Sequence, residues 1–437
     1  MRERARRIDA ATPRDRDRAL DALRAFAILG VVLGHWLVTA LVADSGTVRT
    51  TSPLNVLPEL APVSWVLQTL AVFFLVGGVL GARSRTSARA RGRGYRCWLR
   101  ARLARLLRPV VAVLVVWAVA AAAMLIAGTG LATVHALVRL VLAPLWFLLV
   151  FAALTAATPL IARLHPLWPL AVVLHVDLLR FAFGAPEWIG WLNLAAGWLV
   201  PYCLGTLWAR SGLPGPATGW ALLTAGALAT IALVLYAGYP AAMVGIPGAG
   251  TSNLSPPTLA AVTFGLAQCG AALLLLRPLR RALRRPALWA AVALLNLSAM
   301  TVFLWHQSAM IAVTALGLLA GGGLPGLHTA PDGAEWVLAR TAWLPVFALA
   351  LLVCRAAFRG WESGRAGGRN SGRNSGWESC REGGRAGGRA CAEESGGRSG
   401  PESGRSSCWK RGRENIREGG RDTATAPAAR TTPGWGG

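Results

Sequence analysis

Three polar side chains near the start of the chain fall on one face of an apolar segment. In the stretch RALDALRAFAILGVVLGHWLVTALVA, Asp21 lies three residues before Arg24, and His35 lies eleven residues after it. Because an α-helix turns by about 100° per residue, this spacing places all three side chains on one stripe. The helical rise separates His35 from Arg24 by about 16 Å. With Arg24 at the membrane interface, we expect His35 near the middle of the bilayer.

A histidine at that depth is costly unless it faces a protein interior or a water-filled cavity, so it indicates a functional site. Its neutral imidazole can accept a proton from a hydroxyl group, whereas the guanidinium of Arg24 stays charged and suits a phosphate or carbonyl oxygen. The alternative is structural. In that interpretation His35 bonds to a neighbouring helix, and Arg24 extends to the interface beside Asp21.

The composition predicts that these residues belong to an all-α, polytopic membrane helix bundle. Hydrophobic residues make up 54% of the 437, charged residues only 15%, and the mean hydropathy is +0.46. About 20 mostly apolar residues cross the hydrocarbon core as a helix. Ten segments are candidates, of which the ninth is overlong and expected to break near 296–298: 20–42, 62–82, 106–128, 138–158, 167–183, 188–209, 218–238, 258–277, 288–318 and 336–358.

Arginine counts predict the orientation of these spans. Seven arginines precede the first span, ten lie in 83–108 and five in 277–287, whereas the connections 43–61, 129–137, 239–257 and 319–335 contain only Arg49. Arginine-rich connections stay in the cytoplasm, so ten spans with cytoplasmic N- and C-termini satisfy the alternation. The net charge of +25 therefore indicates membrane flanks and lipid contact, with no nucleic-acid partner.

The same patterns divide the chain into three parts. Residues 1–19 form a basic cytoplasmic segment without a signal-peptide cleavage site, 20–358 form the membrane domain, and 359–437 form a Gly/Arg/Ser-rich tail expected to be disordered and cytoplasmic. The seven cysteines show no metal-ligand spacing with one another or with histidine. We therefore expect no metal and no permanently bound cofactor.

Six segments in order resemble acyltransferase family 3, the bacterial integral membrane O-acyltransferases that modify sugars and other hydroxyl acceptors. The first is LDALRAFAILGVVLGHW, with its Arg24-x10-His35 spacing, and the likeness covers about residues 16–320. The others are FFLVGG at Phe73–Gly78, RARLARLLRP at Arg100–Pro109, PLWFLLVF at Pro144–Phe151, YPAAMVGIPG with TSNLSPPT at Tyr239–Thr258, and MTVFLWHQSAM at Met300–Met310.

The resemblance implies a particular reaction and particular residues. It implies an acyl-CoA donor that enters from the cytoplasm, a carbohydrate or other hydroxyl acceptor near the outer face, and His35 as the central catalytic residue, with Arg24 holding the donor. Arg102 and Arg105 resemble the family's RxxR motif, and two guanidinium groups one turn apart can cradle phosphates, although anchoring of the loop explains them equally. Three further residues are expected to line the site: Asp21, Trp146 and His306.

We therefore predict an acyltransferase of the cell membrane in which His35 acts as general base, or in a variant as an acyl carrier. A secondary transporter or exporter is the alternative, because many spans, a broken helix and intramembrane charges also suit alternating access. A scaffold whose tail recruits partners is a third. In the fifth span, Asp177 and Arg180 are expected to neutralise each other rather than relay protons.

Overall fold

The computed structural model describes residues 2–44, 46–247, 252–321 and 323–362, which all fall within one unit, Met1–Gly368. Of the tail predicted at 359–437, only the first four residues are described, and they continue the last helix. The described part is helical apart from one short hairpin and one isolated bridge, which confirms the predicted all-α class.

The helices in the first half of the chain include one or more for each of the first five predicted apolar segments, together with short helices outside those segments. They are α1 (Arg2–Ala10), α2 (Arg18–Val38), η1 (Pro53–Asn55), η2 (Pro58–Leu60), α3 (Ala61–Ser64), η3 (Trp65–Leu67), α4 (Leu70–Ala90), α5 (Tyr95–Ile126), α6 (Leu131–Leu142), α7 (Leu145–Ile161) and α8 (Leu167–Phe181). The connection at 83–108 is shorter than predicted, because α4 and α5 extend into it and leave only four residues between them.

Helices in the second half match the other five segments. They are η4 (Glu187–Trp191), α9 (Leu192–Ser211), α10 (Pro216–Tyr236), α11 (Leu259–Ala282), α12 (Pro286–Leu297), α13 (Ala299–Leu319), α14 (Ala334–Ala342) and α15 (Leu344–Glu362). The ninth segment breaks at Ser298, within the predicted stretch. The tenth also breaks, at Trp343, just before Pro345.

A β-hairpin replaces the predicted end of the first span. Thr39 is extended, and β1 (Ala40–Asp44) pairs antiparallel with β2 (Thr47–Thr51). The second strand is rich in β-branched residues, and Gly46 takes the positive φ of 78° that the tight turn requires. Hydropathy alone does not distinguish these apolar strand residues from a last helical turn.

Eight helical stretches of the described residues are long and apolar enough to cross a membrane. They correspond to eight of the ten predicted segments. The remaining two are α8, which has only 15 residues, and α9. The chain is thus a polytopic helical protein, and the count of ten spans stays a prediction.

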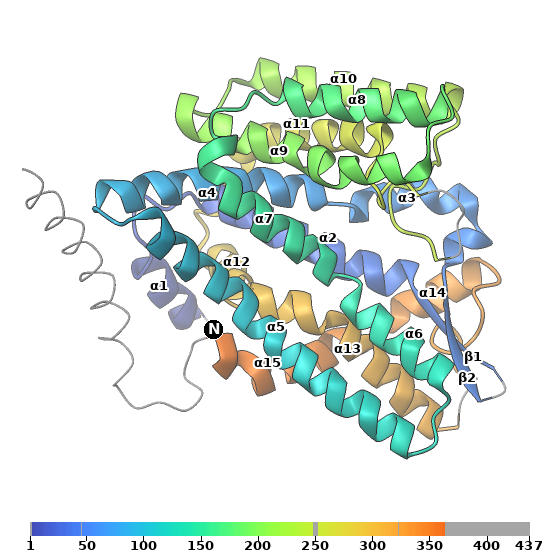
Figure 1. Cartoon of the computed structure of the whole chain (residues 1–437). Coiled ribbons are helices and arrows are strands. Elements are labelled where there is room, and N and C mark those ends of the chain that lie inside the picture. The colour runs from blue at the N-terminus through green and yellow to red at the C-terminus, as the bar shows by residue number, and fades with distance from the viewer. Residues whose placement is uncertain (1, 45, 248–251, 322, 363–437) are drawn as a thin grey trace, which may run out of the picture. The chain divides into compact units, whose positions relative to one another are not determined.

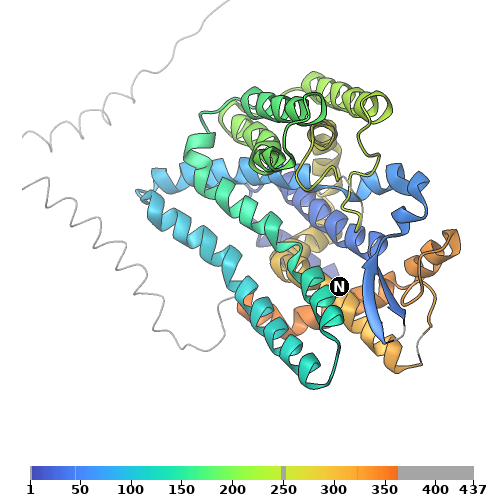
Figure 2. The ribbon, with the colours of Figure 1, turned by 45° about the vertical axis from the view of Figure 1, so that its right-hand side comes forward.

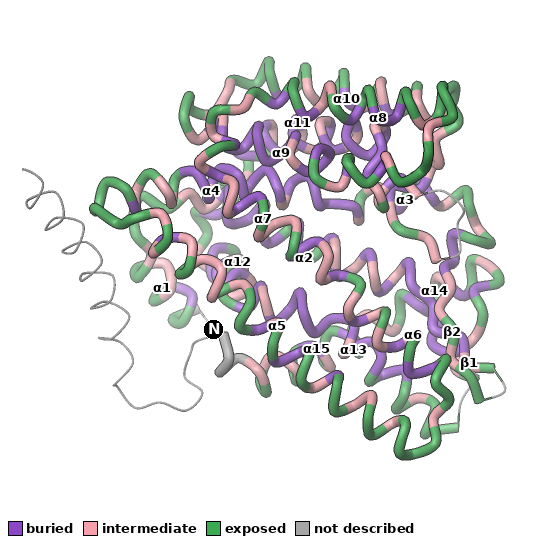
Figure 3. The backbone as a smooth tube through the Cα atoms, in the orientation of Figure 1, coloured by how far each residue is buried: buried purple, intermediate pink, exposed green. Residues whose placement is uncertain are grey.

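The helix α2 occupies the centre of the bundle. It contacts α4 and α11 on one side and α12 and α13 on another. In both views α4 lies between two groups of helices (Figures 1 and 2). The group α8–α11 lies on one side of it, and α5, α6, α13 and α15 lie on the other. Buried residues follow α2, α4, α9 and α13, while the peripheral helices carry exposed positions (Figure 3). Many of the exposed side chains are large and apolar, as lipid-facing surfaces require.

The arginine-rich N-terminal segment and the arginine-rich ends of α4 and α11 lie together at one end of the bundle. The Asp17 carboxylate lies 2.9 Å from the Arg280 guanidinium at the end of α11 and 4.0 Å from Arg83 in α4. The Trp289 indole N–H donates to the Thr12 hydroxyl at 2.7 Å, which ties the N-terminal segment to α12. The three connections predicted to be cytoplasmic therefore share one end of the bundle, as the alternation of arginine counts requires.

Candidate active site

His35 lies in the last two turns of α2 with one ring nitrogen engaged. Its Nδ1 lies 2.8 Å from the Val31 carbonyl oxygen. A carbonyl can only accept, so the neutral ring carries its proton on Nδ1. The other nitrogen, Nε2, has no hydrogen-bond partner among the described residues and is therefore available as a proton acceptor.

A second histidine faces the first. The ring centroids of His35 and His306 are 4.9 Å apart and tilted by 58°. His306 donates from Nδ1 to the Phe303 carbonyl at 2.6 Å, and its buried Nε2 has no partner among the described residues. His306 is completely buried, whereas His35 is only half-buried. Of the two imidazoles, His35 is therefore the one that a substrate can reach.

Two of the three residues predicted to share a stripe on α2, Arg24 and His35, retain accessible surface, whereas the third, Asp21, is buried. Arg24, Val31 and His35 fall within about 40° of one another around the helix and are all half-buried. Ala27 and Ile28, on either side of this stripe, are at most 3% exposed. The helix therefore seals its flanks against neighbouring helices and leaves Arg24 and His35 on one open strip.

The partners of Asp21 and Arg24 differ from simple pairing along the helix. The Asp21 carboxylate accepts a hydrogen bond from Arg16 Nε at 2.6 Å, and this bond raises the pKa of the Arg16 guanidinium. Arg24 instead donates from Nη2 to the Asn296 carbonyl at 3.2 Å, and its buried Nε has no partner among the described residues. Asn296 lies next to the break between α12 and α13. Arg24 is therefore not paired with a carboxylate and can bind an anion there.

The two arginines of the RxxR motif are placed differently. Arg102 is half-buried, stacks over the Trp98 ring at 5.9 Å, and interacts electrostatically with Tyr202, with its neighbour Arg105 and with Arg24. Arg105 is exposed and donates to the Ala101 carbonyl of its own helix at 3.1 Å. The structure thus brings Arg102 toward Arg24 and leaves Arg105 at the periphery.

Aromatic rings connect Trp146 to the histidine pair. Trp146 contacts Phe147 with centroids 6.2 Å apart, Phe147 contacts Phe303 at 5.6 Å, and Phe303 contacts His306 at 6.0 Å. Trp198, on α9, stacks on Phe74 at 5.1 Å. Segments that resemble separate family motifs therefore meet in one apolar wall beside His306, and Trp146 lies in that wall rather than against His35.

The expected pairing of Asp177 with Arg180 is not the main interaction of that carboxylate. Its two oxygens accept hydrogen bonds from Asn193 Nδ2 at 2.8 Å, the Tyr239 hydroxyl at 3.0 Å and the Leu259 backbone N–H at 2.6 Å. Burial and the neighbouring carboxylate raise the pKa of Tyr239, which keeps its hydroxyl a donor. Asp177 therefore holds the start of α11, a structural role favoured by the helix dipole.

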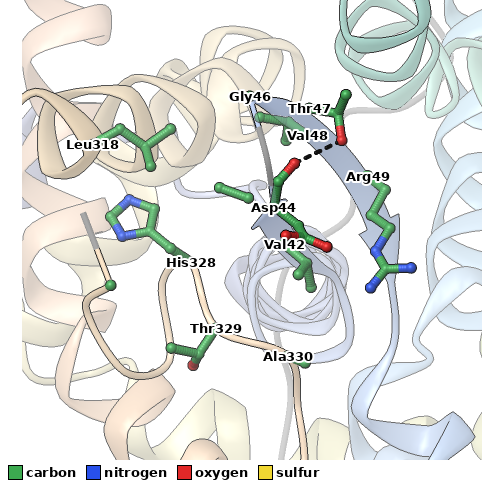
Figure 4. Close-up of a pocket in the computed structure, with 12 residues that line it drawn as sticks. Val42, Asp44, Gly46, Thr47, Val48, Arg49, Leu318, His328, Thr329 and Ala330 are labelled. Carbon is green, nitrogen blue, oxygen red and sulfur yellow. Dashed lines mark hydrogen bonds between the residues drawn. The ribbon is translucent and has the colours of Figure 1, made fainter.

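A separate pocket of about 640 Å³ lies beyond the end of α2 that carries His35. The β-hairpin, with Asp44 and Thr47, and the segment around His328 and Thr329 form its opposite sides (Figure 4). His328 is held on both ring nitrogens, by the Thr314 carbonyl at 2.8 Å and the Leu324 N–H at 3.3 Å. His328 is thus a structural residue of this wall and, unlike His35, has no free nitrogen.

The structure also identifies a residue that the sequence reasoning did not single out. Arg340 lies in the tenth apolar segment and is fully buried beside the end of α2. The signal was present, because a charged residue inside a membrane segment indicates a functional or structural site. However, Arg340 lies near the start of that segment, where charged residues are common, so its position alone does not indicate a buried site.

The structure is thus a polytopic helical membrane protein whose central helix carries a half-buried histidine against a fully buried one, with Arg24 on the same face. The family model described as an acyltransferase domain matches residues 17–359. The chain therefore belongs to acyltransferase family 3, and it is an enzyme that transfers acyl groups other than amino-acyl groups. This membership favours the enzyme over the transporter and scaffold alternatives. No curated protein and no solved structure matches the chain.

Proposed function

We propose that this membrane acyltransferase moves an acyl group from acyl-CoA to a hydroxyl of a sugar, glycan or lipid-linked acceptor, with His35 as general base. The observation that supports this role is the accessibility and hydrogen bonding of the His35 imidazole. His35 is accessible, its Nδ1 is fixed by the Val31 carbonyl, and its Nε2 is unpartnered among the described residues. A base needs a free lone pair within reach of the proton that it removes.

The proposed reaction balances without a cofactor. Nε2 of His35 takes the hydroxyl proton as the acceptor oxygen attacks the thioester carbonyl carbon. The tetrahedral intermediate then breaks its carbon–sulfur bond, and the departing thiolate takes the proton back from His35. In the covalent variant, Nε2 attacks the thioester carbonyl carbon and coenzyme A leaves as the thiolate. The acceptor oxygen then attacks the acyl group, its bond to Nε2 breaks, and the hydroxyl proton passes to the thiolate. Both routes begin and end with the same neutral imidazole.

Arg24 and Arg102 are proposed to hold the phosphates of the donor. Arg24 makes no hydrogen bond to a carboxylate, and Arg102 lies near enough to interact with it electrostatically, so two guanidinium groups face one region with Asp21 as the nearby acid. A bound phosphate would relieve the repulsion between them and accept charge-assisted hydrogen bonds from both guanidinium groups. Both residues lie toward the arginine-rich end of the bundle. The donor would therefore enter from the cytoplasmic side of a bacterial plasma membrane. Arg105, which is exposed, would contribute long-range attraction only.

The remaining site residues are given supporting roles in this proposal. His306 packs against His35 and would hold the orientation of its ring, since the fully buried His306 offers no surface to the substrate. The aromatic wall that includes Trp146 would exclude water from the thioester. Asp21 would keep Arg16, rather than Arg24, occupied. The acceptor would approach from the end of α2 where the pocket beside the β-hairpin lies.

The test follows labelled acyl groups in membranes. Membranes that contain the wild-type chain are incubated with labelled acetyl-CoA and with longer acyl-CoAs, and the release of label from coenzyme A is measured. We expect His35→Ala and His35→Gln to abolish transfer and to leave insertion unchanged. His175→Ala is the matched control, because His175 makes the same Nδ1-to-carbonyl bond, with Ala171 at 2.7 Å, on an exposed part of α8. A fully active His35→Ala variant would refute the proposed base.

A further inference from the structure

Arg340 is an arginine buried in the bundle with no carboxylate to neutralise it. It lies on α14, is 0% exposed, and forms no ion pair with any of the acidic residues that the structure describes. An unpaired charge at such a position is costly, so it is retained only where other groups stabilise it. Its surroundings show what those groups are.

Backbone carbonyls take the place of a carboxylate. Arg340 donates from Nε to the Trp36 oxygen at 2.6 Å, from Nη2 to the Thr39 oxygen at 2.9 Å, and from Nη1 to the Gly326 oxygen at 3.0 Å. Nη2 also lies 2.9 Å from the Met310 sulfur. The planar fork of the guanidinium thus joins α2, α13 and the segment that precedes α14.

Two of these carbonyls belong to the end of the helix that carries His35. Carbonyls in the last turn of a helix have no partner within the helix, and a positive charge there is favourable. Arg340 supplies both the missing donors and the charge at Trp36 and Thr39. The faces of Phe347 and Trp336, 4.7 and 5.7 Å from the guanidinium carbon, stabilise the cation further.

The same contacts extend to the second histidine. The Trp36 indole N–H donates to the His306 carbonyl oxygen at 3.0 Å. Trp36 therefore accepts a hydrogen bond from the guanidinium with its backbone carbonyl and donates one to the backbone of His306 with its side chain. His35 directly precedes Trp36, and its ring lies against His306. Loss of the guanidinium would release the turn that sets the spacing of the two imidazoles.

We infer that Arg340 is a positioning residue, which fixes the last turn of α2 so that His35 is held against His306 in the orientation needed for proton transfer. This inference rests on the proposed role of His35 as the base. It assigns no substrate contact to Arg340. Proton transfer requires close approach and alignment, and a misplacement of about 1 Å can lower a rate by about a hundredfold.

The inference predicts a specific kinetic pattern. Arg340→Gln should lower kcat at least about tenfold per folded protein and leave the KM for acyl-CoA within about twofold. Of the proposed donor arginines, Arg24 lies about three turns from the end of α2 that Arg340 holds, and Arg102 lies on α5. Arg340→Lys should be intermediate, since an ammonium group cannot reproduce the three-way fork. In Arg340→Ala, added guanidinium ion below denaturing concentration should restore part of kcat, and it should have no effect on His35→Ala.

The control is Asp177→Asn, which weakens another buried tie, between α8, α9 and α11, away from the histidines. It should lower thermal stability with kcat per folded protein unchanged. An Arg340→Gln variant with wild-type kcat, or with a change in KM alone, overturns the inference. If Arg340→Gln does not fold, Arg340→Lys decides, because wild-type kcat in that variant also overturns it. An active His35→Ala variant would instead contradict the proposed function, so the two failures are distinguishable.

Discussion

At the scale of single residues, the environment of each ionisable group separates its role from that of its neighbours. His35 and His306 both donate from Nδ1 to a carbonyl of their own helix, and only His35 keeps accessible surface. Arg24 and Asp21 are one turn apart, yet the carboxylate bonds to Arg16, and its charge acts on Arg24 without a direct hydrogen bond. Residue type and spacing predicted that Arg24 and His35 share one face of α2, but long-range contacts, which the spacing does not reveal, determine the partners of each group.

The arginines proposed to bind the donor provide a prediction at this scale. Replacing Arg24 or Arg102 with Met should raise the KM for acyl-CoA about 10- to 100-fold, because a charge-assisted hydrogen bond to phosphate contributes about 1.5–3 kcal/mol. Arg105→Met should change KM less than threefold, since Arg105 is exposed and bonded to its own helix. Initial rates at varied acyl-CoA concentration provide the measurement. Equal effects at Arg102 and Arg105 would contradict the asymmetry.

At the scale of helices, close packing of backbone against backbone holds the two halves of the bundle together. A Cβ on Gly78 of α4 would collide with the Tyr202 carbonyl oxygen of α9, and one on Gly205 of α9 would collide with the Leu75 carbonyl oxygen of α4. Only glycine permits this approach, and small residues at such contacts are typical of membrane helices, where packing drives association. Gly78 closes the FFLVGG segment, which therefore has a packing role.

Substitution at this contact should affect stability more than chemistry. Gly205→Ala should destabilise the folded protein by about 1–3 kcal/mol, because overpacking displaces a backbone. Gly215→Ala is the matched control, since a Cβ there meets nothing within 4 Å and its φ of −70° suits alanine. Thermal unfolding followed by size-exclusion chromatography compares the two variants. A Gly205→Ala protein as stable as the control would show that α4 and α9 do not pack this closely.

The same scale shows how far the sequence predicts the fold. Runs of apolar residues located all ten helical segments, and the polar residues at 296–298 located the break in the ninth. Hydropathy missed the hairpin after Thr39, because the first strand begins with residues as apolar as a helix, and it overstated the length of the 83–108 connection. The contacts of His35 with His306 and of Arg340 with Trp36 join residues about 270 and 300 positions apart. Helical periodicity contains no information about such pairs.

At the scale of the whole molecule, the number of spans depends on α8. Its 15 residues cover about 22 Å, less than the hydrocarbon thickness of about 30 Å. However, Asp177, one turn before the end of α8, bonds to Tyr239 and to the Leu259 N–H, which flank the connection predicted to face outward. Its far end is therefore next to the outer connection, while the arginine-rich ends lie together elsewhere. This placement favours ten spans over eight.

Labelling from outside the cell decides between the two counts. In a chain without native cysteines, Glu187→Cys lies in the connection between α8 and α9 and should react with an impermeant maleimide if both helices cross the membrane. Thr47→Cys, in the hairpin, should react for either count, and Arg284→Cys, in the connection between α11 and α12, should react only after the cells are opened. With eight spans, α8 and α9 would both remain on the cytoplasmic side and Glu187→Cys would behave like Arg284→Cys. Because Asp177 links the end of α8 to the outer connection, we expect Glu187→Cys to follow Thr47→Cys instead.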